Sequence, residues 1–228
     1  MKTVFNLVLV VCALALIYVC YDSITGPIHF DKEKTAREQQ VIARLIDIRK
    51  AQHTYATMHG RQYADDFNKL IDFVKNQKLP IVMKEGQLSD KQLEDGLTER
   101  KAVAMINKAK QTNNWKEVEA AGLMNFKRDT MWVPVMDTLF HKGYNADSLR
   151  YIPFGNGAMF EMAIKNDTAK SGAPIFLYEV KAPYDSYLKG LNEQELINLK
   201  DRNDQLGRYN GLMIGSLEQA NNGAGNWE

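Results

Sequence analysis

The side chains in this sequence that could carry out chemistry are few. Asp137 and His141 stand four residues apart, a spacing that on a helix would let a carboxylate orient an imidazole or share a metal ion with it. A metal site needs three or four ligands, so a plain surface pair is the preferred interpretation. Ser186 and Lys189 fit the S-x-x-K pattern, and Lys170–Gly172 is similar to K-T-G of penicillin-interacting enzymes. Their order is reversed and S-D-N is absent, which argues against a hydrolase.

The remaining chemical candidates are weaker still. His53 and His59 are six residues apart, which does not place them on one helix face. Gly155–Gly157 suits a hairpin turn better than a phosphate loop, and no P-loop or dinucleotide fingerprint is present. Both cysteines, Cys12 and Cys20, lie in one apolar segment, which excludes a disulfide framework elsewhere in the sequence. We therefore expect a protein that is not an enzyme, with no catalytic residue, metal or cofactor.

The composition is that of an ordinary globular domain. The chain has 228 residues, of which 45% are hydrophobic and 25% charged, and this length predicts one domain plus an appendage. Its net charge is only +1. Because nucleic-acid binding requires a strong basic footprint, we expect no nucleic-acid partner.

The appendage is an apolar segment at the N-terminus. Val4 to Tyr21 covers eighteen residues without a charge, with Asn6 as its polar exception. As a helix it would be ~27 Å long, close to the thickness of the hydrocarbon core of a bilayer. A cleaved signal peptide is the alternative, but Leu-Ile-Tyr-Val-Cys at the exit lacks the small residues that cleavage needs. We predict an uncleaved membrane span that includes Val4, Asn6, Cys12, Cys20 and Tyr21.

The charge around this span predicts its orientation. Lys2 precedes it and Asp22 follows it at once, which favours a cytoplasmic N-terminus. We therefore expect a single-pass inner-membrane protein with the bulk of the chain in the periplasm. Asn6 could hydrogen-bond to another transmembrane helix, or it could lie near the interface, where its polarity costs little.

Beyond the span, the spacing of apolar residues predicts a long amphipathic helix that ends at a corner. Gly26-Pro27 should break or kink the chain first. A stripe at helical spacing then follows: Val41, Leu45, Ile48, Ala51, Tyr55 and Met58. Gly60 predicts a left-handed stop, and a shorter stripe through Tyr63, Phe67, Leu70 and Phe73 predicts a second helix that ends at Leu79-Pro80.

The second half of the chain changes from helical to strand patterns. Residues 81–128 read as a helical insertion, with Ser89 and Gln92 as a capping box and glycines as stops. Three aromatic and β-branched runs then predict an antiparallel meander: Tyr151–Phe154, Ala158–Lys165 and Pro174–Lys181. Met131–Val135 could add an edge strand, since Pro134 cannot donate a hydrogen bond inside a sheet.

The last segments of the chain are predicted to form a helix, a strand and a tail. Asn192 caps a late helix that runs to about Leu206. "YNGLMIGSL" could be a last strand, and Asn221–Glu228 reads as a loose tail.

These elements predict an α+β fold in four regions. They are a transmembrane anchor (1–21), an amphipathic helix and corner (22–80), a helical insertion (81–128) and an antiparallel sheet with a late helix and tail (129–228). Five methionines and two tryptophans lie between residues 115 and 162, and we expect them to pack in the core rather than to form a soft binding surface. They are Met124, Met131, Met136, Met159, Met162, Trp115 and Trp132.

The order of these elements resembles the pilin and pseudopilin architecture. The residues that carry the resemblance are Ile48, Ala51, Gln52, Tyr55, Gly60, Tyr63, Phe67, Leu70 and Phe73. In type II secretion pseudopilins a similar helix ends in a Tyr/Gly corner before a meandering sheet. The whole chain is also similar to an uncharacterised single-pass membrane protein family of Bacteroidetes, a resemblance that implies no known activity. Prepilins carry a processing glycine before phenylalanine and an early glutamate in the span, and this chain carries neither.

The resemblance implies a structural corner of Tyr55, Gly60, Tyr63, Phe67 and Leu70, and a protein that works by contact. We expect a membrane-anchored, non-enzymatic envelope protein that acts through other envelope proteins in a pilus-like or secretion-like assembly. A tethered ligand-binding or sensory domain, with its ligand between the sheet and the insertion, is the alternative. A small hydrolase that uses Ser186 and Lys189, or Asp137 and His141, is the weakest of the three hypotheses.

Overall fold

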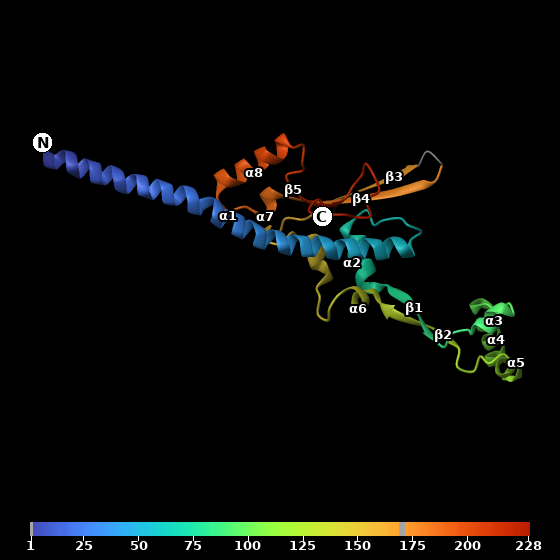
Figure 1. Ribbon diagram of the computed structural model, residues 1–228. Coiled ribbons are helices and arrows are strands. Elements are labelled where there is room, and N and C mark those ends of the chain that lie inside the picture. The colour runs from blue at the N-terminus through green and yellow to red at the C-terminus, as the bar shows by residue number, and fades with distance from the viewer. Residues whose placement is uncertain (1, 169–171) are drawn as a thin grey trace. The chain divides into compact units, whose positions relative to one another are not determined.

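The computed structural model describes residues 2–168 and 172–228 of a mixed α+β chain. The chain divides into two compact units, which are described separately. The helix–sheet unit comprises the chain up to Lys75 and His141–Glu228. The ribbon unit is Asn76–Phe140. Figure 1 shows the elements of each, coloured along the chain.

The helix–sheet unit is built on one long helix. α1 spans Lys2–Met58, 57 residues with Pro27 inside it, and Figure 1 shows it as one uninterrupted rod. The predicted break at Gly26-Pro27 is therefore wrong. A proline in a helix removes one hydrogen bond and costs about 3 kcal/mol. Long helical segments on both sides, one of them fixed by the buried residues Val41, Leu45 and Ile48, outweigh that local cost.

The sheet of this unit has three antiparallel strands in the order β3-β4-β5. β3 is Glu161–Thr168, β4 is Pro174–Pro183 and β5 is Gly211–Gly215, and α1 contacts β5. The late strand is thus the third member of the sheet. Tyr151–Phe154, predicted as a strand, makes a single bridge between Tyr151 and Met159.

Tyr151–Phe154 does not extend into a strand because a tight turn follows it. Phe154 and Asn156 both have positive φ, at 63° and 47°, and Gly157 has φ of 92°. The amide of Ile152 donates to the carbonyl of Ala158, and the amide of Ala158 donates to the carbonyl of Gly155. The chain therefore reverses within a few residues, as predicted for Gly155–Gly157, and pairing ends after one bridge.

The other elements of this unit are short. α2 is Phe67–Asn76, η1 is Ala146–Arg150 and α7 is Tyr184–Tyr187. α8 is Glu193–Gln205, where the Asn192 side chain accepts hydrogen bonds from the amides of Gln194 and Glu195, as predicted for a cap. The tail is not loose: the amide of Gly215 donates to the carbonyl of Ala224, and Asn226 binds the backbone of Gly211 and Met213.

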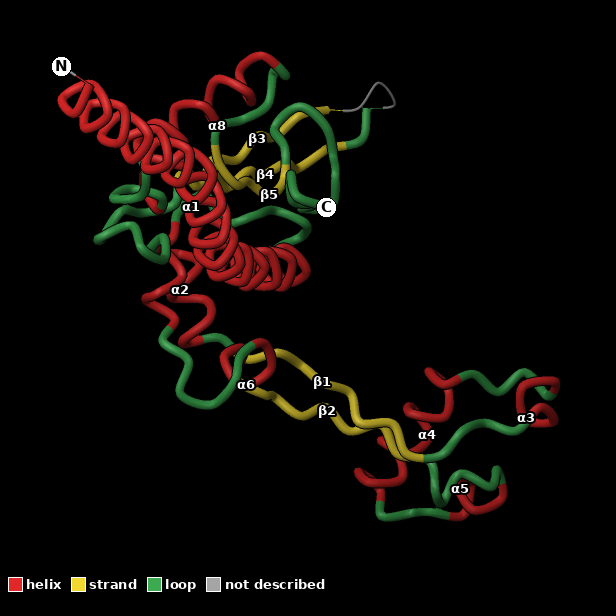
Figure 2. The backbone as a smooth tube through the Cα atoms, turned by 60° about the vertical axis from the view of Figure 1, so that its left-hand side comes forward, coloured by secondary structure: helices red, strands yellow, loops and turns green. Residues whose placement is uncertain are grey.

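The ribbon unit is a two-stranded hairpin with helices at its ends. β1 (Lys78–Glu85) pairs antiparallel with β2 (Lys127–Pro134) over the full length of both strands. Figure 2 shows this ribbon with α6 (Val135–Leu139) at one end and a helical cluster at the other. The cluster contains α3 (Asp90–Glu94), α4 (Glu99–Thr112) and α5 (Lys116–Ala120).

The sequence predicted the helices of the cluster but not α6. It also missed β1, whose residues from 81 onward were expected in the helical insertion. The capping box of Ser89 and Gln92 is present at α3. Met131–Val135 contributes most of its residues to a strand, as predicted, but that strand pairs with β1 and not with the three-stranded sheet. Leu79 and Pro80 accordingly lie inside β1. The compact unit of Asn76–Phe140 is wider at both ends than the expected insertion of 81–128, because the paired strands belong to it.

Candidate functional site

The predicted membrane span lies along the first part of α1. Val4 and Tyr21 are 68% and 67% exposed, and Asn6, Cys12 and Cys20 are exposed as well. An 18-residue window here has a mean hydropathy of 2.6 and none of it is buried. Large apolar side chains exposed along a whole helix segment need an apolar surrounding. By length and composition this helix could span a membrane, as a single-pass protein requires.

The predicted corner is assembled at the other end of α1. Gly60 adopts φ of 64° and is followed by Arg61 at 72°, so two left-handed residues turn the chain. Phe67 and Leu70 are buried on α2. The ring of Tyr55 stacks on His59, with centroids 3.9 Å apart, and meets Phe73 edge to face at 5.1 Å.

Tyr63 links the corner to the sheet. Its ring centroid lies 4.4 Å from that of Tyr178 on β4 and 6.1 Å from that of His53 on α1. Burial raises the pKa of the Tyr63 phenol. The five corner residues therefore belong to one structural region, in which they fix how the chain leaves α1.

The sequence did not indicate the role of Gln52 at this corner. Gln52 is fully buried, and its amide side chain hydrogen-bonds to both backbone groups of Ala64. A glutamine within an apolar helical stripe was the signal that could have found it, since a buried amide must be paired.

The chemical candidates from the sequence do not adopt the geometry that their spacing suggested. Ser186 donates its hydroxyl proton to the carbonyl of Pro183 at 2.6 Å, and Lys189 lies beyond the end of α7. α6 ends at Leu139, before His141, so the helical spacing proposed for Asp137 and His141 is absent. Lys170 and Ser171 lie outside the described residues. In residues 2–168 and 172–228, no group of three metal-ligating side chains comes together.

The methionines and tryptophans are more exposed than expected. Core packing was predicted for them, and this is wrong for Met124 (57% exposed), Met131 (49%), Met159 (54%), Trp132 (61%) and Trp115 (38%). Two of these, Met131 and Trp132, lie on β2. A two-stranded ribbon buries little of its own side-chain surface, because no second layer covers either face.

The ribbon carries a continuous set of apolar pairs. Ile81 stands opposite Met131, and Pro80 stands opposite Trp132. Ile81, Val82 and Met83 are 41%, 49% and 48% exposed. Neighbouring residues of a strand point to opposite faces, so apolar side chains occupy both faces of the ribbon.

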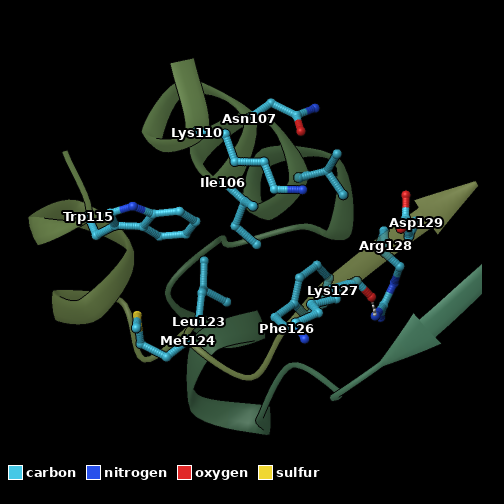
Figure 3. Close-up of a pocket in the computed structure, with 11 residues that line it drawn as sticks. Ile106, Asn107, Lys110, Trp115, Leu123, Met124, Phe126, Lys127, Arg128 and Asp129 are labelled. Atoms are coloured by element: carbon cyan, nitrogen blue, oxygen red, sulfur yellow. Dashed lines mark hydrogen bonds between the residues drawn. The ribbon is translucent and has the colours of Figure 1, made fainter. Parts of the chain in front are cut away.

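A cavity of about 350 Å³ lies in the helical cluster at the end of the ribbon. Figure 3 shows the side chains that line it, contributed by α4, the loops around α5 and the start of β2. The apolar part is formed by Val103, Ile106, Trp115, Leu123, Met124 and Phe126. The polar part is formed by Asn107, Lys110, Lys127, Arg128 and Asp129.

Arg128 is the most constrained of these polar residues. Its side chain is 7% exposed and its guanidinium carbon lies 3.9 Å from the centroid of the Phe126 ring. Nη1 donates to the carbonyls of Glu85, Gly86 and Lys127, and Nη2 donates to Glu99 at 3.0 Å. This hydrogen bond lowers the pKa of the Glu99 carboxyl.

No family model, curated protein or solved structure matches this chain.

Proposed function

We propose that this protein is a single-pass membrane protein that acts by contact with other envelope proteins and catalyses no reaction. The first part of α1 lies in the inner membrane, and both units are exported to the periplasm. The ribbon unit presents the contact surface. The assembly is of the pilus-like or secretion-like kind that the resemblance of the corner implies.

One observation supports this proposal above all: the apolar side chains exposed along the ribbon. Ile81, Met83, Met131 and Trp132 are each more than 40% exposed. Exposed apolar patches of this kind mark interaction sites, and tryptophan and methionine are enriched at protein interfaces. Paired strands hold these side chains in fixed register, so a partner would meet a preformed surface.

The helix–sheet unit supports the anchoring role. α1 continues without interruption from the apolar segment to residues that pack against the sheet. Val41, Leu45, Ile48 and Ala51 are fully buried in that part. A helix that is fixed in a folded unit at one end and apolar at the other connects the membrane directly to the folded chain.

The proposal can be tested by site-specific photo-crosslinking in native membranes. A photoreactive phenylalanine analogue replaces Trp132 or Ile81 on the ribbon, with Gln111 on α4 and Asn198 on α8 as exposed polar controls. We expect discrete crosslinked products from the ribbon positions and none from the controls. We expect Met131→Ser to remove the product formed at Ile81, because Met131 stands opposite Ile81 on the same face of the ribbon. A ribbon that forms no product, or the same products as the controls, contradicts the proposal.

A further inference from the structure

The cavity in the helical cluster combines an apolar wall with cationic side chains. Ile106, Leu123 and Phe126 are buried, while Trp115 and Met124 are 38% and 57% exposed beside the cavity. In Figure 3 the Trp115 ring faces Ile106 and Leu123, which leaves an apolar slot between them. Cavities that bind small organic molecules have this character, and about 350 Å³ is at the small end of their range.

The charged groups of the lining are mostly cationic. Lys110, Lys127 and Arg128 line the cavity together with a single carboxylate, that of Asp129. Lys127 pairs with Glu85 at 3.4 Å, but both side chains are more than half exposed, so this pair is weak. In Figure 3 the Lys110 side chain extends from α4 over the cavity.

Arg128 adds an independent observation. Its Nε is buried and has no hydrogen-bond partner among the described residues, although Nη1 and Nη2 are both engaged. A buried donor without an acceptor is less favourable than a paired one, because it has lost its water and gained no partner. The residue is held by three carbonyls and Glu99, so it cannot turn to solvent without breaking those bonds. Arg128 is therefore a fixed positive charge at the lining of the cavity.

We infer that this cavity binds a small organic anion, with an aromatic or aliphatic body and one carboxylate. The body occupies the slot between Trp115, Ile106 and Leu123, and the carboxylate lies toward Arg128, Lys127 and Lys110. A neutral apolar molecule would leave the cationic groups of the lining without an anionic partner, and an amine would be repelled by three cations. This site lies wholly within the ribbon unit and is independent of the contact surface proposed above.

Phenylbutyrate is a suitable probe, with phenylbutanol and phenylbutylamine as neutral and cationic analogues of the same body. The full chain in lipid nanodiscs, with isotope-labelled methionine methyl groups, reports binding by NMR. Met124 lines the cavity, whereas Met131 and Met159 do not. We expect phenylbutyrate to shift the Met124 methyl signal saturably, and phenylbutanol to bind about tenfold more weakly for the loss of one charge-assisted hydrogen bond.

Charge variants separate recognition of the carboxylate from recognition of the body. The double variant Lys110→Gln and Lys127→Gln should narrow the difference in affinity between phenylbutyrate and phenylbutanol, because only Arg128 then remains to meet the carboxylate, and should leave phenylbutanol binding unchanged. Lys108→Gln, on the same helix but outside the cavity, should bind phenylbutyrate like the wild type. Absence of a Met124 shift, equal shifts at all three methionines, or equal affinity for the acid, alcohol and amine would each overturn the inference.

Discussion

The side-chain amide of Gln52 forms two hydrogen bonds with the backbone of Ala64, twelve residues further along the chain. Its Oε1 accepts from the Ala64 amide and its Nε2 donates to the Ala64 carbonyl, both at 2.9 Å. Gln52 is fully buried and Ala64 is 1% exposed. This pairing closes the corner after α1 by satisfying the backbone of a residue that is in neither helix nor strand.

Replacing Gln52 with leucine should therefore destabilise the helix–sheet unit. The change keeps a buried side chain of similar size but leaves the amide and carbonyl of Ala64 unpaired, at a cost of about 2–4 kcal/mol. Chemical unfolding monitored by circular dichroism gives the difference. Gln40→Leu, an exposed position on the same helix, is the matched control and should change stability little. Equal effects at the two positions would contradict the role given to Gln52.

The C-terminal tail should contribute to the stability of the sheet. The Asn226 side chain accepts from the amide of Met213 at 3.1 Å and donates to the carbonyl of Gly211 at 2.9 Å. Asn226→Ala should reduce the free energy of unfolding by about 1 kcal/mol, because the side chain is partly solvated. Glu228→Gln, which weakens an exposed ion pair with Arg49, should cost less. If Asn226→Ala leaves the free energy of unfolding unchanged, the tail does not stabilise the sheet.

Glu38 should make the stability of this unit depend on pH. Burial raises the pKa of its carboxyl above the ordinary value of 4.5, and the nearby Lys34 opposes this only in part. Between the ordinary and the raised pKa, the folded state holds the proton and the unfolded state has lost it. Stability should therefore fall as pH rises through this interval.

Glu38→Gln should remove that slope, because glutamine does not titrate. Urea unfolding at a series of pH values from about 4.5 to neutral measures it. Glu218→Gln, at an exposed position of the same unit, should keep the slope of the wild type. If the stability of Glu38→Gln still falls as pH rises over this range, another titrating group causes the slope.

A charge in the middle of the apolar segment should prevent stable membrane insertion. Val11→Arg places a guanidinium near the centre of the span, at a cost of about 2.5–3.5 kcal/mol on the insertion scale. Alkaline extraction of membranes should release more of this variant than of the wild type. Gln39→Arg, beyond the span, is the control and should stay in the membrane fraction. Protease added to spheroplasts tests the orientation, and it should digest the exported units of this control. Equal extraction of all three chains would argue against the span.

Local features of the structure could be predicted from the sequence because their causes are local. Ser89 and Asn192 cap helices through bonds to amides two or three residues away. Gly60 and Gly122 end helices because glycine adopts positive φ without a steric cost. The apolar segment at the N-terminus can be identified from its composition alone. For the same reason the break expected at Pro27 was wrong: its local cost is opposed by packing further along α1, which the local pattern does not contain.

Tertiary structure alone decided which segments pair and which side chains stay exposed. β2 could have joined either sheet by its pattern, and only the fold pairs it with β1. Burial of a methionine or tryptophan depends on whether another layer covers its strand, and no layer of the ribbon unit covers Trp132. The cavity beside Arg128 is assembled from α4, the loops around α5 and β2. Its members come from residues 103–110 and 115–129, and how the chain folds between these stretches decides that they line one cavity.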